Sequence, residues 1–231
     1  MPTALITGAS RRLGLYLCEH LLDDGWQVYG LTRSASSELK SLARDALHIY
    51  ELERYEPASV ERACAELSAE IGELTLLLNN ASIYEPDESR ADFYEALFFI
   101  HMQLPAMLID AFSGILKRSR GNIVSITDIY ADNPNADYNL YCSTKAGLQA
   151  LTLGCAKKLA PQVRANCIQP GPIKFLSEHD EDYKKQVLAE TLLQSEGGFD
   201  PIYKTLKFIL DNPYLTGTCI KVDGGRSLVR G

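Results

Sequence analysis

Tyr141 and Lys145 stand four residues apart, and residues at that spacing share one face of a helix. A free phenol has a pKa of about 10 and exchanges protons poorly at neutral pH. A lysine ammonium one turn away stabilises the phenolate, so we expect it to bring the tyrosine pKa toward the working range. The pair therefore predicts acid–base catalysis with Tyr141 as the proton-exchanging group.

Asp128 stands thirteen residues before Tyr141, directly after an apolar segment typical of a strand. An aspartate can accept hydrogen bonds from the N–H groups of a nitrogen heterocycle, or relay a proton toward a ring nitrogen. The alternative interpretation is that Asp128 only caps the helix that follows, since Asp is a good N-cap.

A glycine turn, Thr7-Gly8-Ala9-Ser10-Arg11-Arg12-Leu13-Gly14, follows the first predicted strand. Such a turn places backbone N–H groups and the positive end of a helix against a diphosphate. Gly8 permits the tight turn, and Gly14 lets the helix pack on the sheet. Arg12 stands where the usual dinucleotide fingerprint has a further glycine, and Arg11 and Arg12 add two guanidinium groups suited to an anion.

The second predicted strand ends at Thr32-Arg33-Ser34. Enzymes that prefer NAD usually have an acidic side chain here for the ribose 2′-hydroxyl, whereas a basic one accommodates the 2′-phosphate of NADP. Arg33 and Ser34 therefore predict NADPH as the cofactor. The alternative is that Arg33 is an ordinary solvated arginine.

Strands and helices must alternate to hold these groups, and the apolar patterns predict that they do. The expected strands are Thr3–Thr7, Gln27–Thr32, Leu47–Tyr50, Leu74–Leu78, Asn122–Thr127, Val163–Gln169 and Cys219–Val222. The expected helices are Gly14–Asp24, Pro57–Ile71, Asp92–Leu116 and Asp137–Leu159. This alternation predicts an α/β fold: a single domain over residues 1–231, with a doubly wound, seven-stranded parallel sheet and helices on both faces. The charged stretch Ser177–Phe199 follows the end of a strand and interrupts the alternation of strands and helices. We therefore interpret 174–199 as a candidate substrate lid.

Composition and charge limit the classes of molecule that the chain is expected to bind. The chain of 231 residues has a net charge of −7, so nucleic acid is not expected as a main partner. No leader pattern is apparent, and no apolar run approaches the roughly 18 residues of a membrane span, so we expect a soluble, cytoplasmic protein. Its six cysteines form no CxxC pair and show no zinc-ligand spacing, which predicts reduced cysteines and no metal site.

Together these segments resemble the short-chain dehydrogenase/reductase family over essentially the whole chain. The resemblance rests on TGASRRLG, NNAS, Tyr-x-x-x-Lys, Pro170-Gly171-Pro172-Ile173 and Val222-Asp223-Gly224-Gly225. It implies that Tyr141 protonates the substrate, that Lys145 binds the nicotinamide ribose, and that Asn79 lies along the adenosine. It also implies a homotetramer that pairs the helix Asp137–Leu159 and the helix after the fourth strand. The implied cofactor-binding residues are Gly8, Ser10, Arg11, Arg12, Leu13, Gly14, Arg33, Ser34, Asn79, Ala81, Ser82, Tyr141, Lys145, Pro170, Gly171 and Ile173.

Three departures from the family pattern point to one branch. The chain has Asp128 where serine is usual and Arg12 where glycine is usual. It also has Ser82 in place of the last glycine of the family's usual NNAG segment. These changes resemble the pteridine reductases, and ITD, KKLAP, SEHDEDY and VDGGRSL resemble bacterial dihydromonapterin reductases. The resemblance implies NADPH-dependent reduction of dihydromonapterin, with dihydrofolate and dihydrobiopterin as further candidates, and implies that Tyr84 stacks on the pterin. The implied substrate-binding residues are Arg12, Ser82, Tyr84, Asp128 and Tyr141.

The sequence is also compatible with two other functions. One is a short-chain reductase of a carbonyl substrate, against which the missing catalytic serine argues. The other is an inactive dinucleotide-binding sensor, which Gln103 keeps open, because the family usually has an asparagine there to complete a proton relay.

Overall fold

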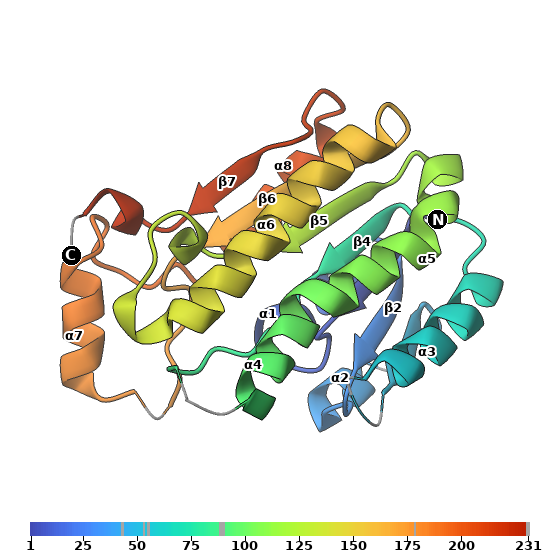
Figure 1. Ribbon diagram of the computed structural model, residues 1–231. Helices are drawn as coiled ribbons and strands as arrows, with labels where there is room; N and C mark the ends of the chain where they lie inside the picture. The colour runs from blue at the N-terminus through green and yellow to red at the C-terminus, as the bar shows by residue number, and fades with distance from the viewer. Residues whose placement is uncertain (43, 53, 55, 88–90, 178, 230–231) are drawn as a thin grey trace.

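A seven-stranded sheet runs through the centre of the computed structural model, which describes residues 1–42, 44–52, 54, 56–87, 91–177 and 179–229 (Figure 1). The strand order is β3-β2-β1-β4-β5-β6-β7, and every pair of neighbours is parallel. The strands are β1 (Thr3–Thr7), β2 (Gln27–Thr32), β3 (Leu47–Glu51), β4 (Leu76–Asn79), β5 (Asn122–Ile126), β6 (Arg164–Pro170) and β7 (Cys219–Val222). The predicted fold class is confirmed, and each strand lies within two residues of its expected bounds.

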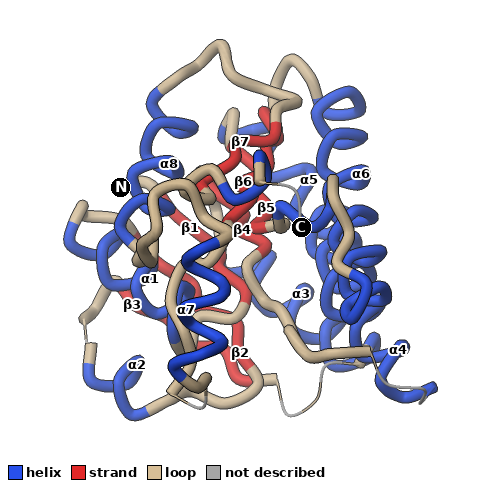
Figure 2. Tube along the Cα trace, turned by 90° about the vertical axis from the view of Figure 1, so that its left-hand side faces the viewer, coloured by secondary structure: helices blue, strands red, loops and turns tan. Residues whose placement is uncertain are grey.

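Helices cover both faces of the sheet (Figure 2). Successive strand residues point to opposite faces, so Leu5 packs with the layer that contains α3 (Pro57–Glu70), α5 (Leu104–Ser119) and α6 (Asn139–Leu159). Ala4 and Ile6 pack with the other layer, which contains α1 (Arg12–Asp23), α2 (Ser37–Ser41) and α8 (Asp200–Asp211). Two apolar cores, one on each face, therefore fix the strand ends that carry the site. Helices α2 and α8 were not among the predicted elements.

The helix expected over Asp92–Leu116 is three consecutive segments. It begins as α4 (Ala91–Phe98), widens into the π-helical turn η1 (Phe99–Gln103) and continues as α5. Pro105 explains the wide turn, since proline has no N–H for the carbonyl four residues earlier and its ring clashes with that carbonyl. Contrary to the sequence expectation, Asp92–Ser119 is long and apolar enough to cross a membrane by length and composition. Half of its apolar window is buried inside the protein, as in a core helix.

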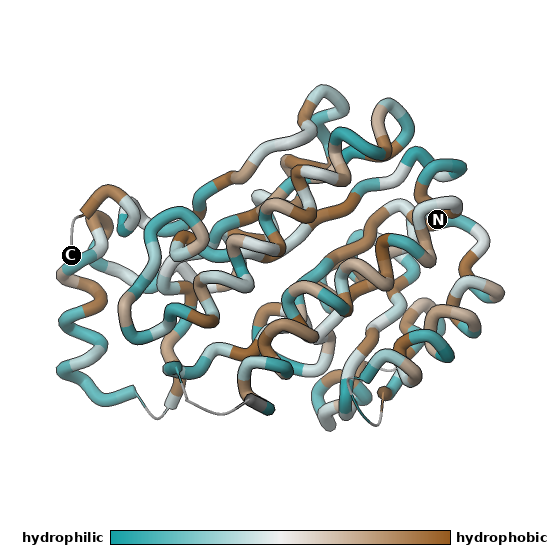
Figure 3. Tube along the Cα trace, in the orientation of Figure 1, coloured by the Kyte–Doolittle hydropathy of each residue, from teal (hydrophilic) through white to brown (hydrophobic). Residues whose placement is uncertain are grey.

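The predicted lid segment stands at one end of the molecule. It contains α7 (Glu181–Ala189), which is mostly hydrophilic and lies beside the C-terminal segment (Figures 1 and 3). Arg226 anchors the helix, because its guanidinium donates to the Val187 carbonyl at 2.7 Å and to the Glu190 carboxylate at 2.7 Å. Glu178 lies outside the described residues, so the candidate lid is described without it.

The strand order reverses direction between β1 and β4. Open α/β sheets bind ligands at such a switch point, outside the carboxyl ends of the strands. The glycine turn, the segment Asn80-Ala81-Ser82 and Asp128 all follow strands at this edge. All six cysteines are free thiols, and five of them are buried.

Candidate active site

A cavity of about 880 Å³ opens at the carboxyl edge of the sheet. It is near the upper end of the size range of small-molecule sites, roughly 1,000 Å³. Its wall brings together nearly all the residues predicted from the sequence, which come from five strand ends and from helices α1 and α6. The predicted residues on this wall are Gly8, Ser10, Arg11, Arg12, Leu13, Gly14, Arg33, Ser34, Ala81, Ser82, Tyr84, Asp128, Tyr141, Lys145, Pro170, Gly171 and Ile173.

Asn79 departs from its expected place along the adenosine. It is the last residue of β4, is 2% exposed, and donates from Nδ2 to Ser125 Oγ at 3.1 Å in the next strand. Its neighbour Asn80 lines the cavity instead and donates from Nδ2 to the Thr7 carbonyl at 2.9 Å. Asn79 therefore stabilises the sheet beneath the site, and Asn80 joins the first strand end to the fourth.

The glycine turn has the close packing that a diphosphate cradle requires. A Cβ on Gly8, whose φ is +69°, would lie 2.8 Å from the Ala81 Cα, and a Cβ on Gly14 would lie 2.0 Å from the Gly8 carbonyl oxygen. No side chain caps the start of α1, where Arg11 is the N-cap residue. The first amides of α1 thus keep their hydrogen-bonding capacity for an anion, so the residues present fit a dinucleotide diphosphate.

Arg12 adopts a left-handed backbone conformation, with φ +51°, at the position where glycine is usual. A non-glycine residue accepts strain in this region, which indicates that the side chain has a role. Its guanidinium donates to the Lys174 carbonyl and lies 6.0 Å from the centre of the Phe199 ring. Arg12 therefore joins the phosphate turn to both ends of the candidate lid.

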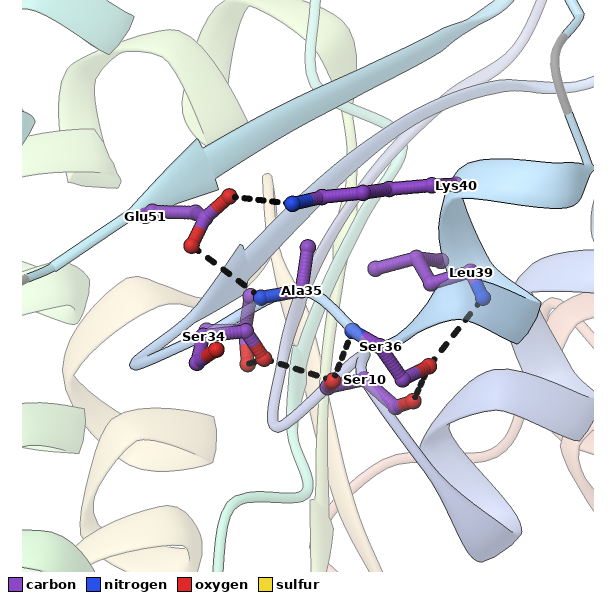
Figure 4. Close-up of polar contacts among 8 residues, drawn as sticks. Ser10, Ser34, Ala35, Ser36, Leu39, Lys40 and Glu51 are labelled. Carbon is purple, nitrogen blue, oxygen red and sulfur yellow. Dashed lines mark hydrogen bonds and ion pairs between the residues drawn. The ribbon is translucent and has the colours of Figure 1, made fainter.

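Serine hydroxyls fix the loop after β2 against the phosphate turn (Figure 4). Ser10 Oγ donates to the Ser34 carbonyl at 2.6 Å and accepts from the Ser36 amide at 2.8 Å. Ser36 Oγ donates to the Ser10 carbonyl at 2.6 Å and caps α2 by accepting from the Leu39 amide at 3.1 Å. Ser10 thus shapes the place where a ribose phosphate would lie.

The loop after β2 also carries charged and polar residues at this end of the cavity. Arg33 and Ser34 are exposed on the cavity wall. Glu51, at the end of β3, accepts from the Ala35 amide at 3.2 Å and pairs with Lys40 at 3.4 Å (Figure 4). The Ala35 amide is the main cause that lowers the pKa of Glu51, so this carboxylate is ionised beside the loop.

Tyr141 and Asp128 form the polar centre of the site. The Tyr141 hydroxyl donates to Asp128 Oδ2 at 2.8 Å. Asp128 Oδ1 accepts from the Tyr130 amide at 2.9 Å and so caps the short helix Ile129–Ala131. The two interpretations of Asp128 are therefore compatible, because separate oxygens serve the helix cap and the tyrosine.

Burial raises the pKa of both partners. Burial and the charge of Asp128 raise the pKa of Tyr141 well above its usual value, and burial raises the pKa of Asp128. The expected lowering of the tyrosine pKa is not found, because desolvation and the negative charge of Asp128 both disfavour the phenolate. Both groups therefore hold their protons more tightly than free side chains do, and for Asp128 the raised pKa favours a carboxyl group that can carry a proton.

Lys145 is buried one helical turn beyond Tyr141. Its Nζ donates to the Ile126 carbonyl at 2.9 Å and lies 5.7 Å from the centre of the Tyr141 ring. Burial lowers the pKa of Lys145 to about 8. The ammonium is thus held beneath the tyrosine, charged at neutral pH, with donor capacity left for a ligand hydroxyl.

Aromatic side chains form the part of the cavity wall beside Tyr141. Tyr84 stacks on Tyr138 with ring centres 4.6 Å apart, and its ring meets that of Tyr141 edge-on at 4.9 Å. Tyr183 of the lid segment lies on the same cavity wall. This wall suits a flat conjugated ring, because offset and edge-on aromatic contacts stabilise such a ring beyond the area it buries.

Besides Asn80 and Tyr183, the sequence did not point to three further polar side chains at the site. His101 is fully buried beside Tyr141, and Thr144 is buried between them on α6. Arg226 reaches the cavity wall from the C-terminal segment. For His101, the sequence offers one signal: a histidine within the apolar run Phe98–Leu104, where a buried polar side chain needs a hydrogen-bonding partner.

Comparisons with known proteins agree with this geometry. Residues 2–187 match a family model described as short chain dehydrogenase. Proteins named dihydromonapterin reductase from Enterobacter sp. (strain 638) and from Escherichia coli (strain K12) are each 27% identical over 230 residues. Both alignments cover 97% of this chain and 96% of the relative.

A solved structure shares the fold. It is described as an apo SCOR enzyme from Clostridium thermocellum, and it superposes with a TM-score of 0.88 at 22% identity. The alignment covers 100% of this chain and 94% of the other, so the whole chain has that fold.

Proposed function

The chain belongs to the short-chain dehydrogenase family, and we propose that this oxidoreductase uses NADPH to reduce a dihydropterin, with dihydromonapterin as the first candidate. The hydrogen bond from Tyr141 to Asp128 carries the proposal, because it places a carboxyl group where a carbonyl reductase of the family has serine. Tyr84 supports the proposal, since it offers an aromatic surface beside that pair. The named relatives support dihydromonapterin among the dihydropterins.

The reaction adds one hydride to the carbon and one proton to the nitrogen of a ring C=N bond. When bound, the reduced nicotinamide supplies the hydride. Tyr141 supplies the proton from its hydroxyl, and Asp128 replaces it from its own carboxyl group. The raised pKa of Asp128 favours this direction, because a protonated Asp128 can donate to the tyrosine oxygen and turn the tyrosine O–H toward the cavity. Lys145 holds its charge beneath the tyrosine and orients the cofactor ribose.

A substrate panel tests the proposal. NADPH oxidation is measured with dihydromonapterin, dihydrobiopterin, dihydrofolate and several ketones at matched concentrations. We expect kcat/KM for at least one dihydropterin to exceed that for every ketone. Turnover of ketones alone would instead support a carbonyl reductase. NADPH binding without any turnover would support the sensor alternative.

Arg33→Asp tests the choice of cofactor. If Arg33 contacts the 2′-phosphate, the substitution removes a charge-assisted hydrogen bond worth roughly 1.5–3 kcal/mol and adds repulsion. We expect the preference for NADPH over NADH to fall at least about tenfold, measured as the ratio of dissociation constants. Arg44→Asp is the matched control, because Arg44 pairs with Asp23 on the surface and does not line the cavity. An unchanged ratio in Arg33→Asp would place Arg33 away from the phosphate.

We also propose that the chain forms a homotetramer through α6 and the helix α4–η1–α5. Tyr94 and Phe98 support this assembly, because they leave large apolar surfaces exposed on α4 (48% and 43% exposed). Light scattering at micromolar concentration should give four times the mass of one chain. A monomeric mass would contradict the proposal.

A further inference from the structure

His101 lies at the centre of a hydrogen-bonded network that takes no part in the proton transfer proposed for Tyr141 and Asp128. It is fully buried on η1, between the loop after β4 and helix α6. Its Nε2 lies 2.8 Å from Ser82 Oγ and accepts from the Ile83 amide at 3.4 Å. Its Nδ1 lies 2.8 Å from Thr144 Oγ1.

The partners of His101 determine its protonation. Thr144 Oγ1 donates its only proton to the Tyr141 carbonyl at 2.9 Å, so Nδ1 must carry a proton and donate to Thr144. The Ile83 amide can only donate, so Nε2 must be an acceptor. His101 is therefore a neutral imidazole with its proton on Nδ1. Burial first, and then the charge of Lys145, lower its pKa well below the usual value and favour the same state.

The backbone around His101 explains why it reaches both partners. The π-helical turn is closed by the Leu104 amide, which donates to the Phe99 carbonyl. Pi-helical turns insert a residue and re-aim a side chain, and they are frequent at functional sites. The turn also packs closely on α6, because a Cβ on Gly147 would lie 2.6 Å from the Met102 sulfur.

We propose that His101 is a positioning residue that clamps the loop carrying Tyr84 to the helical turn carrying Tyr141, and so sets the gap that receives the flat ring of the substrate. The loop side of the clamp is Ser82 and Ile83, which directly precede Tyr84. The helix side is Thr144, which is bonded to the Tyr141 carbonyl. The His101 ring also meets the Tyr141 ring edge-on at 5.5 Å, so it packs directly against the tyrosine side chain. The choice of substrate ring rests on the proposed function, whereas the clamp itself does not.

Three substitutions separate the two sides of the clamp. His101→Phe keeps a flat ring and removes both hydrogen-bonding nitrogens. His101→Gln offers an acceptor near the place of Nε2 and loses the donor to Thr144. His101→Asn offers a donor near the place of Nδ1 and loses the acceptor for the loop. His20→Phe is the control, because His20 lies on α1 outside the cavity wall.

Two measurements are made on each variant. Amide hydrogen exchange in residues 82–84 and 141–145 reports the clamp without any substrate. In His101→Phe we expect exchange in 82–84 to rise about tenfold, as when one or two hydrogen bonds are lost, with exchange in the sheet unchanged. We expect kcat to fall roughly 10- to 100-fold, as for a misplaced catalytic group, while the NADPH dissociation constant changes less than about twofold.

The paired variants test the direction of each contact. His101→Gln should slow amide exchange in 82–84 relative to His101→Phe. His101→Asn should slow amide exchange in 141–145 relative to His101→Phe. If the phenylalanine variant does not fold, these two variants, compared with each other, test the clamp. Wild-type exchange in 82–84 and a normal kcat in the folded variants would overturn the clamp. If the exchange effects occur but no dihydropterin is reduced, the clamp stands and only the proposed substrate fails.

Discussion

Tyr141→Phe is expected to lower dihydropterin turnover by roughly 10²–10⁴-fold, the usual loss for a positioned acid–base group. The substitution removes only the hydroxyl, so the ring keeps its edge-on contacts with Tyr84 and His101. The lost group is the donor to Asp128, and no other described side chain donates to that carboxylate. The loss is measured as kcat from the consumption of NADPH under saturating conditions.

Cofactor binding distinguishes lost chemistry from lost structure in this variant. Lys145 keeps its bond to the Ile126 carbonyl, and the phosphate turn is untouched, so the NADPH dissociation constant should stay within about twofold of wild type. Tyr214→Phe is the matched control, since Tyr214 is 98% exposed and should keep full activity. If Tyr141→Phe retained more than about a tenth of wild-type kcat, the proton would have to come from another group.

The catalytic pair illustrates what the sequence can and cannot predict. Helical spacing places Tyr141 and Lys145 on one face, and the rule that ligands bind at parallel strand ends places Asp128 at the same edge of the sheet. The direction of the Tyr141 pKa shift does not follow from these patterns, because burial depends on packing from segments distant in the chain. Local pattern thus predicts position, and tertiary packing decides protonation.

Asn79 and His101 illustrate two further limits. The fourth strand was expected to end at Leu78, but it continues through Asn79. Because side chains alternate between faces, Asn79 as a strand residue shares the covered face of Leu77 and bonds Ser125 of the next strand, and Asn80 lines the cavity. His101 escaped notice because its partners Ser82 and Thr144 lie 19 and 43 residues away. Spacing rules apply within one helix or strand and do not reveal contacts among three separate segments of the chain.

Asp128→Ser tests whether the carboxyl group defines the substrate class. Serine is also a good N-cap, so the short helix Ile129–Ala131 should be kept while the proton-carrying group is lost. We expect dihydropterin kcat to fall by roughly 10²–10⁴-fold, with NADPH binding nearly unchanged. Asp128→Asn is the matched variant, since it preserves size and cap and still accepts from Tyr141 but cannot relay a proton.

The double variant shows whether the two groups act together. If Asp128 and Tyr141 serve one proton path, the double variant Asp128→Ser, Tyr141→Phe should be hardly slower than Tyr141→Phe alone. Multiplied losses would mean that the two side chains contribute through separate steps. If Asp128→Ser instead keeps wild-type dihydropterin turnover, its role is limited to accepting the Tyr130 amide. The assignment to pterins would then depend on Tyr84 and on likeness to the named relatives.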